Sequence, residues 1–134
     1  MQKEAKAGDT REKRKMIAVV EDDARLANMF SDMLSFSGQW QLRVFSDGES
    51  ARDQIPHIGA HLIILDVGLP NLDGASLYKI LRGHSSTRNT PIIIVTGSYD
   101  WELHRMGLQS GFLLQKPFSP RELLSMIRAL IPSE

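Results

Sequence analysis

Residues 61–74 read HLIILDVGLPNLDG, and this stretch decides the fold. It begins with an apolar run, stops at the single carboxylate of Asp66 and continues into a turn rich in glycine and proline. Such a run is typical of a strand buried on both faces, as in a parallel sheet covered by helices. In open α/β sheets the functional site lies beyond the carboxyl ends of the strands. Asp66 is therefore either a functional carboxylate or a solvated residue that closes a strand, and the other strands decide between these two interpretations.

The composition is that of an ordinary globular protein. Its 134 residues suffice for one domain with a buried core, and 42% hydrophobic and 24% charged residues are typical values. The absence of cysteine excludes disulfides and thiolate metal sites. No apolar run approaches membrane-spanning length and the amino terminus is charged rather than signal-like, so we expect a cytoplasmic protein. Four histidines lie scattered without ligand-like spacing, so no zinc site is expected: His57, His61, His84 and His104.

The net charge of zero hides an asymmetry between the amino-terminal tail and the rest of the chain. Residues 1–15 carry six basic and three acidic side chains, a net charge of +3, which leaves −3 on the remainder. Because the tail has no large apolar residue after Met1, we expect residues 1–15 to be flexible and residues 16–132 to form the folded domain. The tail either touches an acidic surface such as nucleic acid or is simply solvated. An acidic body argues against direct binding of nucleic acid by the domain.

Strands and helices are predicted to alternate along the folded domain. Apolar or alternating runs predict four more strands, at residues 16–20, 41–45, 91–95 and 112–114. Helical periodicity predicts five helices, at residues 24–37, 46–55, 73–83, 100–109 and 119–131. Right-handed crossovers between such elements give an α/β fold with a doubly wound, five-stranded parallel sheet.

Local signals predict where the helices begin and end. Asp23 suits the start of the first helix, and Gly38 suits its end. Residues 46–49 have the spacing of a capping box that opens the second helix, which Pro56 stops near residue 55. Ser119 opens the last helix with a second capping box, followed by proline at the first helical position.

The apolar faces of these elements predict the core. In the strand at residues 41–45 the alternation places Leu42 and Val44 on one face and indicates an edge strand. The helix at residues 73–83 turns three apolar residues inward: Leu77, Ile80 and Leu81. The first helix carries a stripe at helical spacing, formed by Leu26, Met29, Phe30, Met33 and Leu34. The methionines at helical spacing are expected to belong to the core.

Polar side chains follow four of the five strands at their carboxyl ends. In the flavodoxin-like strand order 2-1-3-4-5, the first and third strands are neighbours, so Glu21 and Asp22 lie beside Asp66. Thr96 ends the fourth strand and Lys116 follows the fifth. One rim of the sheet would therefore carry three carboxylates, a hydroxyl and an ammonium group.

This set of groups suits phosphoryl chemistry at a carboxylate. Clustered carboxylates without soft ligands favour Mg²⁺, which binds oxygen atoms octahedrally and offsets the repulsion between the acids and a phosphoryl dianion. Asp66 could then attack phosphorus and form an aspartyl phosphate. Thr96 could hydrogen-bond one phosphoryl oxygen, and Lys116 could pair with another.

Four short motifs together resemble the receiver domain of two-component response regulators, the CheY-like family. The motifs are VEDD at residues 20–23, LDVGLPNLDG at 65–74, VTG at 95–97 and KPF at 116–118. The resemblance covers residues 16–131. It implies a signalling domain rather than an enzyme, in which Asp66 is the phosphoacceptor and receives phosphate from a phosphohistidine of a sensor histidine kinase or a histidine phosphotransfer protein.

The resemblance also implies roles for the residues around Asp66. Asp22 and Asp66 would bind Mg²⁺ directly, Glu21 through water, and Gly68 through its backbone carbonyl. Thr96 would be the switch hydroxyl and Lys116 the catalytic lysine. The peptide bond between Lys116 and Pro117 is commonly cis in this family.

The sequence departs from the family pattern at the aromatic switch. Receiver domains usually have an aromatic residue three positions before the lysine, and Leu113 occupies that position here. Phe112 lies one residue earlier, where strand parity points it to the opposite face unless a bulge shifts the register. The acceptor site therefore looks intact, whereas the switch formed with Phe112 and Leu113 is in doubt.

Other functions stay open at this point. A phosphatase with an aspartate nucleophile would need a general-acid aspartate where Gly68 stands, and no glycine-rich nucleotide loop follows the first strand. A degenerate receiver that acts as a phosphorylation-independent interaction module is the main alternative. Tyr99 and Trp101 belong either to a partner-binding face formed by the fourth helix, fifth strand and fifth helix, or to partly buried packing. The chain is either a free-standing regulator or part of a longer protein with an output domain.

Overall fold

The computed structural model describes residues 14–36, 38–67, 73–97, 105, 107 and 112–132. The elements are β1 (Lys15–Val20), α2 (Ala24–Phe36), β2 (Trp40–Phe45), α3 (Gly48–Gln54), the 3-10 turn η1 (Ile55–His57), β3 (Leu62–Asp66), α4 (Gly74–Gly83), β4 (Ile92–Thr96), β5 (Phe112–Gln115) and α6 (Pro120–Leu130). Five strands and four α-helices thus fall within the described residues. Nearly all of the fourth expected helix, at residues 100–109, lies outside them, as does most of the expected tail.

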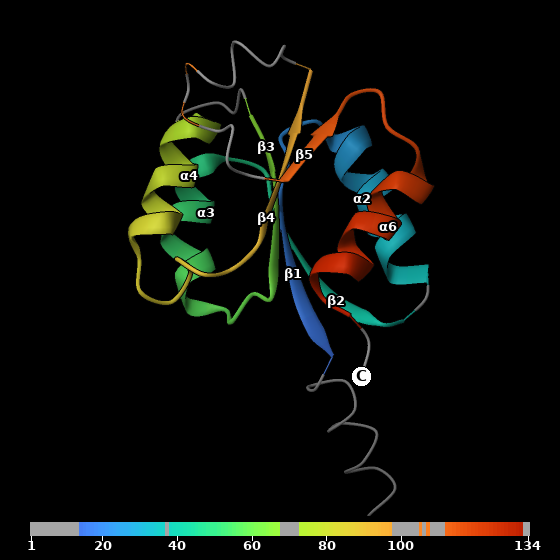
Figure 1. Cartoon of the computed structure of the whole chain (residues 1–134), viewed down its shortest axis with the longest axis horizontal. Helices are drawn as coiled ribbons and strands as arrows, with labels where there is room; N and C mark the ends of the chain where they lie inside the picture. The colour runs from blue at the N-terminus through green and yellow to red at the C-terminus, as the bar shows by residue number, and fades with distance from the viewer. Residues whose placement is uncertain are drawn as a thin grey trace, which may run out of the picture.

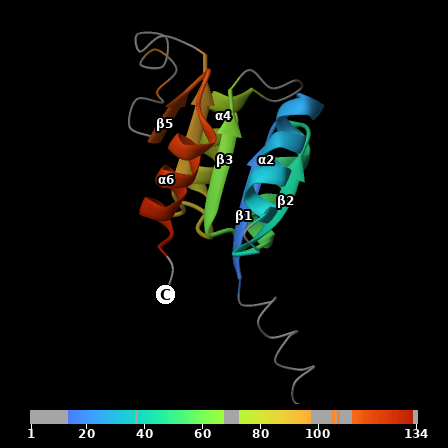
Figure 2. The same cartoon turned by 90° about the vertical axis from the view of Figure 1, so that its right-hand side faces the viewer.

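The five strands form one parallel sheet in the order β2-β1-β3-β4-β5, which confirms the predicted topology. Helices α3 and α4 cover one face of the sheet, and α2 and α6 cover the other (Figure 1). Turned by 90°, the molecule shows the strands running in one direction behind α2 and α6 (Figure 2). All carboxyl ends of the strands therefore meet at one edge of the sheet.

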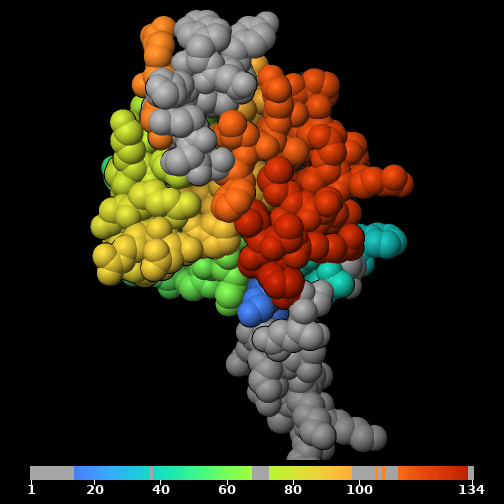
Figure 3. Space-filling view, viewed as in Figure 1, coloured from blue at the N-terminus to red at the C-terminus, as the bar shows by residue number. Residues whose placement is uncertain are grey.

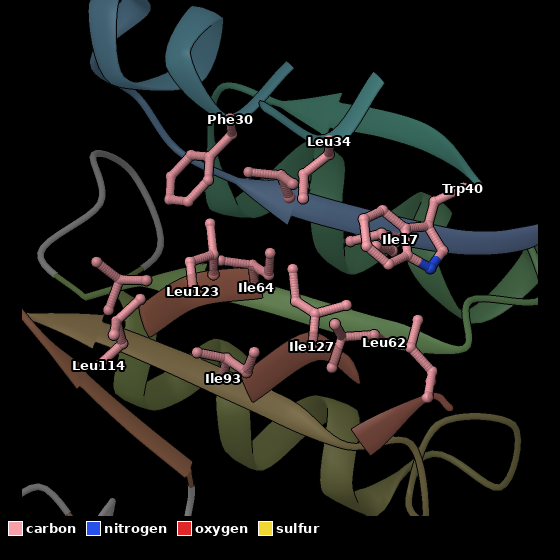
Figure 4. Packing of buried hydrophobic residues seen from close by; sticks show 13 residues of the cluster. Ile17, Phe30, Leu34, Trp40, Leu62, Ile64, Ile93, Leu114, Leu123 and Ile127 are labelled. Carbon is pink, nitrogen blue, oxygen red and sulfur yellow. The ribbon is translucent and has the colours of Figure 1, made fainter. Parts of the chain in front are cut away.

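Alternate residues of the central strands feed two hydrophobic clusters, one on each face of the sheet. On the side of α3 and α4, Ala18 and Val20 pack with Leu77 and Leu81. On the other side, Ile17 and Val19 pack against α2 and α6, as Figure 4 shows for the labelled members of that cluster. Strands β3 and β4 are buried at every residue. This burial explains why they are continuous apolar runs in the sequence. No helix among the described residues has the length and apolar character needed to cross a bilayer.

The predicted ends of the first and last helices are confirmed. Asp23 Oδ1 accepts a hydrogen bond from the backbone N–H of Arg25 at 2.9 Å, and Gly38 adopts the positive φ of 68° that suits glycine after a helix. Ser119 caps α6 with a complete capping box in which Ser119 Oγ accepts from Glu122 N and Glu122 Oε1 accepts from Ser119 N. The amino-terminal end of α6, which lies at the carboxyl edge of the sheet, is therefore fixed by local hydrogen bonds.

Two predictions about faces and caps were wrong. Asp47, rather than Ser46, caps α3, because its carboxylate accepts from Ser50 N at 2.8 Å. Strand β2 lies at the edge of the sheet, as predicted; Val44 is 40% exposed there, and the buried positions are Trp40 and Phe45 at the two ends of the strand. The predicted inner face of α4 was wrong in one residue, described next.

Ile80 does not face the core. It is 38% exposed, and Tyr78 is buried in its place beside Leu77 and Leu81. The guanidinium of Arg82 lies 5.1 Å from the centre of the Tyr78 ring, so the ring is covered on its outer side by a side chain of the same helix.

The methionines of α2 and α6 are partly buried, in agreement with their predicted place in the core. Met33 and Met126 pack at the margin of the hydrophobic cluster under those helices.

Candidate phosphoacceptor site at the carboxyl edge of the sheet

Three carboxylates from two neighbouring strands meet at the edge of the sheet where the carboxyl ends of the strands lie. Glu21 and Asp22 directly follow β1, and Asp66 is the last residue of β3, which is hydrogen-bonded to β1. One oxygen atom from each carboxylate lies within 4.8 Å of the others. Asp66 and Glu21 are buried whereas Asp22 is exposed, so the cluster opens to solvent on the side of Asp22. The predicted convergence of these residues is therefore observed.

Glu21 is the most unusual of these acids. It is 2% exposed; its backbone N–H donates to Phe45 O, and its Oε2 accepts from Asp23 N at 3.1 Å. Its Oε1 is buried without a hydrogen-bond donor, because the adjacent Asp66 carboxylate offers acceptors when ionised. Burial, followed by a proton shared with Asp66, raises the pKa of Glu21 to about 8, against the lowering effect of Lys116. Burial is therefore the main reason that Glu21 keeps its proton, and the neighbouring Asp66 adds to the effect.

Lys116 supplies a positive charge on the other side of Asp66. Its Nζ lies 3.3 Å from Asp66 Oδ2 and 3.4 Å from Oδ1. These distances exceed the 2.7–2.9 Å or so of a tight charge-assisted hydrogen bond, so the ammonium has room to move toward a group bound on Asp66. The side chain is 38% exposed, which keeps the ammonium accessible from solvent.

The backbone on both sides of Lys116 is fixed. Lys116 N donates to Thr96 O at 2.8 Å, and the Lys116–Pro117 bond is cis, as expected from the family resemblance. Two residues further on, the Phe118 ring stacks on Phe30 of α2 with 5.8 Å between centroids. Sequence analysis did not identify this aromatic pair, which anchors the loop that carries the lysine.

Thr96 is the last residue of β4 and is 1% exposed. Because Asp66 pairs in register with Val95, Thr96 lies one residue beyond Asp66 along the neighbouring strand. It is therefore at the same edge as the acids, between β3 and the loop of Lys116. Gly68, the remaining predicted metal ligand, lies outside the described residues, as do Tyr99 and Trp101.

The two residues of the doubtful switch lie on different sides of β5. Leu113 is partly buried and packs against the cluster under α3 and α4, whereas Leu114 packs against the opposite cluster. Phe112 is 45% exposed, and the regular register with β4 has no bulge. Strand parity thus predicted the orientation of these residues, and no aromatic ring occupies the inward position. In Figure 3 the orange atoms of β5 lie at the surface between α4 and α6.

The residues present fit a magnesium ion. Magnesium prefers six oxygen ligands at about 2.1 Å, so two opposite ligands lie about 4.2 Å apart, comparable with the separation of these carboxylate oxygens. The buried Glu21 Oε1 without a donor is the kind of atom that a cation or its water would satisfy. All candidate ligands are hard oxygen donors, which excludes a preference for soft metals.

Comparison with known proteins decides the family. Residues 17–128 match the model of the response regulator receiver domain. The chain belongs to this family. Residues 1–16 lie outside the matched segment, and the four motifs that suggested the resemblance lie within it.

Two curated relatives of this receiver domain are a transcriptional regulatory protein and a DNA-binding response regulator. The transcriptional regulatory protein GltR of Pseudomonas aeruginosa is 41% identical over 117 residues, which cover 86% of this chain and 48% of GltR. The DNA-binding response regulator MtrA of Mycobacterium tuberculosis is 35% identical over 118 residues, which cover 87% of this chain and 50% of MtrA. The chain thus spans about half the length of the curated relatives it matches.

Solved structures of similar fold include a magnesium-bound receiver domain. The receiver domain of a sensor histidine kinase from Pseudomonas aeruginosa, with magnesium coordinated in its active site cleft, has a TM-score of 0.81 and 29% identity, covering 90% of this chain and 99% of that one. The chemotaxis response regulator CheY4 of Vibrio cholerae has a TM-score of 0.78 and 26% identity, covering 88% of this chain and 99% of that one.

Proposed function

We propose that Asp66 accepts a phosphoryl group from a phosphohistidine and that the resulting charge switches the binding of partners. The observation that carries this proposal is the position of Asp66, with two acids on one side and Lys116 Nζ at 3.3 Å on the other. This carboxylate has a cation within reach and further acids beside it. Such an arrangement suits nucleophilic attack on a polyanionic group, whereas a purely structural ion pair would not need the additional acids. The domain would act as a signalling switch and not as an enzyme on a small substrate.

The transfer would exchange one bond to phosphorus for another. An Asp66 carboxylate oxygen attacks phosphorus as the bond from phosphorus to the donor imidazole nitrogen breaks, and that nitrogen leaves with the electron pair. The product is an acyl phosphate on Asp66 and a neutral imidazole once solvent has adjusted its proton. Because the acyl phosphate retains the phosphoryl charge, the edge of the sheet gains negative charge as the partner leaves.

Two side chains of the domain would respond to this charge. Lys116 would follow the phosphoryl group with its ammonium, which already contacts both oxygen atoms of Asp66. Thr96, buried beside β3, would donate its hydroxyl to another phosphoryl oxygen. Together these two contacts would draw the ends of β4 and β5 toward Asp66.

Magnesium, when bound, would offset the negative charge of the acids and the phosphoryl group. Asp22 and Asp66 are the side chains proposed to hold it directly, and Glu21 through water. The carbonyl of Gly68 is proposed as a further ligand. The buried Glu21 Oε1, which lacks a hydrogen-bond donor, supports this proposal, because a cation or its bound water would satisfy that atom.

Labelling with a small phosphodonor tests the proposal. The purified chain is incubated with acetyl phosphate and Mg²⁺, and intact mass and acid lability report an acyl phosphate. We expect one phosphoryl group on the wild type and none on Asp66→Asn, with Asp53→Asn as a matched control on the exposed face of α3. Uptake of phosphate by Asp66→Asn at the wild-type rate would refute the assignment.

The partners proposed for the domain follow from the family. A sensor histidine kinase or histidine phosphotransfer protein would supply phosphate, and an output domain or target protein would bind the face formed by β5, α6 and the helix expected at residues 100–109. Since GltR and MtrA are about twice the length of the match, an output domain in a longer chain is consistent with these relatives.

A phosphorylation-independent interaction module is the second candidate. It is favoured by Leu113, which fills the inward position of β5 with an aliphatic side chain. The two candidates differ in the labelling experiment, since a module of this kind takes up no phosphate. They also differ in binding, because a phosphorylation-dependent partner would distinguish the labelled from the unlabelled chain.

A further inference from the structure

The start of α4 lies unusually close to the end of β3. Gly74, the first residue of α4, is buried, and Asp73 caps it by accepting from Ser76 N at 2.8 Å. A Cβ atom at Gly74 would lie 2.7 Å from Val67 Cα and 2.9 Å from Asp66 O. Real Cβ atoms do not approach other atoms so closely, and both neighbours are backbone atoms that cannot rotate away. Only glycine therefore fits between the helix and the strand.

The requirement at Gly74 is one of space. Its φ is not among the positive values of the described glycines, so its backbone conformation suits other residues. Helix propensity by itself favours alanine over glycine. A side chain at position 74 is thus excluded by the strand end and not by the helix.

The strand end in question is the one that carries the proposed phosphoacceptor. Val67 N donates to Val95 O at 3.3 Å, so β4 holds the backbone after Asp66 from one side while Gly74 approaches it from another. The Asp66 carboxylate must meet Lys116 Nζ and the acids after β1 within a few ångströms. A displacement of the backbone at Asp66 and Val67 would change all of these distances together.

We infer that Gly74 is a positioning residue, which sets the place of Asp66 by allowing α4 to pack directly on the backbone of the strand end. This inference rests on the proposed function of Asp66. It adds a residue that touches neither phosphate nor metal but on which the geometry of transfer depends. Misplacement of a reacting group by about 1 Å lowers rates on the order of a hundredfold.

Gly74→Ala tests the inference, with Gly83→Ala as its matched control. Gly83 is the last residue of the same helix, and nothing lies within 4 Å of the position of its Cβ. We expect the initial rate of labelling by acetyl phosphate at saturating Mg²⁺ to fall about 10- to 100-fold in Gly74→Ala. Gly83→Ala should label at the wild-type rate.

A second control separates positioning from loss of stability. Ile55→Val removes a methyl group from a fully buried residue far from the site in sequence, and its labelling is compared at a temperature where all variants are folded. If Gly74→Ala is partly unfolded at every practical temperature, all variants are compared in sucrose, which favours the compact state. Labelling of Gly74→Ala within twofold of wild type, or an equal loss in Ile55→Val, would overturn the inference.

A readout without phosphate or metal distinguishes this inference from the proposed function. The backbone amide of Val67 reports the contact directly, so its NMR chemical shift and hydrogen exchange should change in Gly74→Ala and stay unchanged in Gly83→Ala. An unchanged Val67 amide in Gly74→Ala would refute the positioning role. A wild-type chain that takes up no phosphate would instead refute the proposed function, and the amide comparison would still decide the role of Gly74.

Discussion

At the scale of single residues, Asp66 lies between opposing electrostatic forces. Lys116 attracts its carboxylate, whereas Asp22 repels it, as does Glu21 when it is ionised. Because Lys116 is partly exposed, water can solvate its ammonium when its partner loses charge, but the buried carboxyl groups of Asp66 and Glu21 have no such relief. The repulsion therefore dominates the effect of Asp66 on stability.

Asp66→Asn is expected to abolish labelling and to leave the metal-free domain as stable as the wild type or more stable, by up to about 1 kcal/mol. The reason is that an amide removes one charge from the carboxylate cluster and can donate a hydrogen bond to Glu21. Chemical denaturation in the presence of a chelator measures the difference. Marked destabilisation would show that the ion pair with Lys116 outweighs the repulsion.

Glu21 gives the metal-free domain a specific dependence on pH. Its pKa is about 8 in the folded chain, against an ordinary value of 4.5, chiefly because of burial. Between these values the unfolded chain ionises Glu21 while the folded chain keeps its proton, so stability is full below about pH 4.5 and falls as the pH rises toward 8. We expect Glu21→Gln to remove this fall, as measured by denaturation at several pH values without Mg²⁺.

The comparison of wild type with Glu21→Gln can also contradict this role of Glu21. If wild type and Glu21→Gln lost stability in parallel between pH 5 and pH 8, other groups would be responsible. His61 changes stability in the opposite direction, because burial lowers its pKa and its Nδ1 accepts from Met16 N. Its contribution is present at higher pH and is lost as the pH falls through its lowered pKa.

The residues of the site differ in how far the sequence could predict them. Asp66 ends β3 and Lys116 follows β5, so the parallel topology alone brings them to one edge. The burial of Glu21 beside the exposed Asp22 depends on side-chain orientation after a strand end, which no periodicity records. The close contact of Gly74 depends on the distance between two elements, and its only signal was the pair of aspartate and glycine at the start of a helix.

At the scale of elements, α6 is tied to the site by its amino terminus. The helix begins four residues after Lys116, and the capping box of Ser119 and Glu122 satisfies backbone donors at this end. Phe118 anchors the intervening loop on Phe30. The start of α6 therefore helps to fix the segment from which the lysine extends.

Ser119→Ala is expected to destabilise the domain by about 1 kcal/mol, because a backbone donor at the start of α6 loses its acceptor. Ser125→Ala is the control, since Ser125 is exposed within the same helix and alanine has the higher helix propensity there. Urea denaturation of both variants measures the difference. Equal stability of the two variants would mean that the cap contributes nothing beyond helix propensity.

Elements were predicted well where burial is complete and less well where it is partial. Strands β3 and β4 are covered on both faces, so every residue before the final Asp66 and Thr96 is apolar and the pattern has one interpretation. In the edge strand β2 and in α4, neighbouring apolar residues compete for few buried positions. There the packing of whole elements decided that Tyr78 is buried and that Val44 and Ile80 are exposed.

At the scale of the molecule, the site joins the neighbouring strands β1 and β3 of the sheet. Its acids come from β1 and β3, and each of these strands contributes to the clusters on both faces of the sheet. The cluster of carboxylates exists only when these strands are paired. A cation bound there would therefore stabilise the complete fold and not one local segment.

Magnesium is accordingly expected to raise the melting temperature of the whole domain. At tenfold its dissociation constant, a ligand of the folded state contributes about 1.4 kcal/mol, or roughly 4–6 °C for a domain of this size. The buried Trp40, far from the site in the cluster under α2 and α6, should report the same shift by fluorescence in a Trp101→Phe background as circular dichroism reports for the helices. Asp22→Asn should reduce the shift in both signals. An undiminished shift in Asp22→Asn, or a shift in only one signal, would contradict a magnesium site that joins β1 to β3.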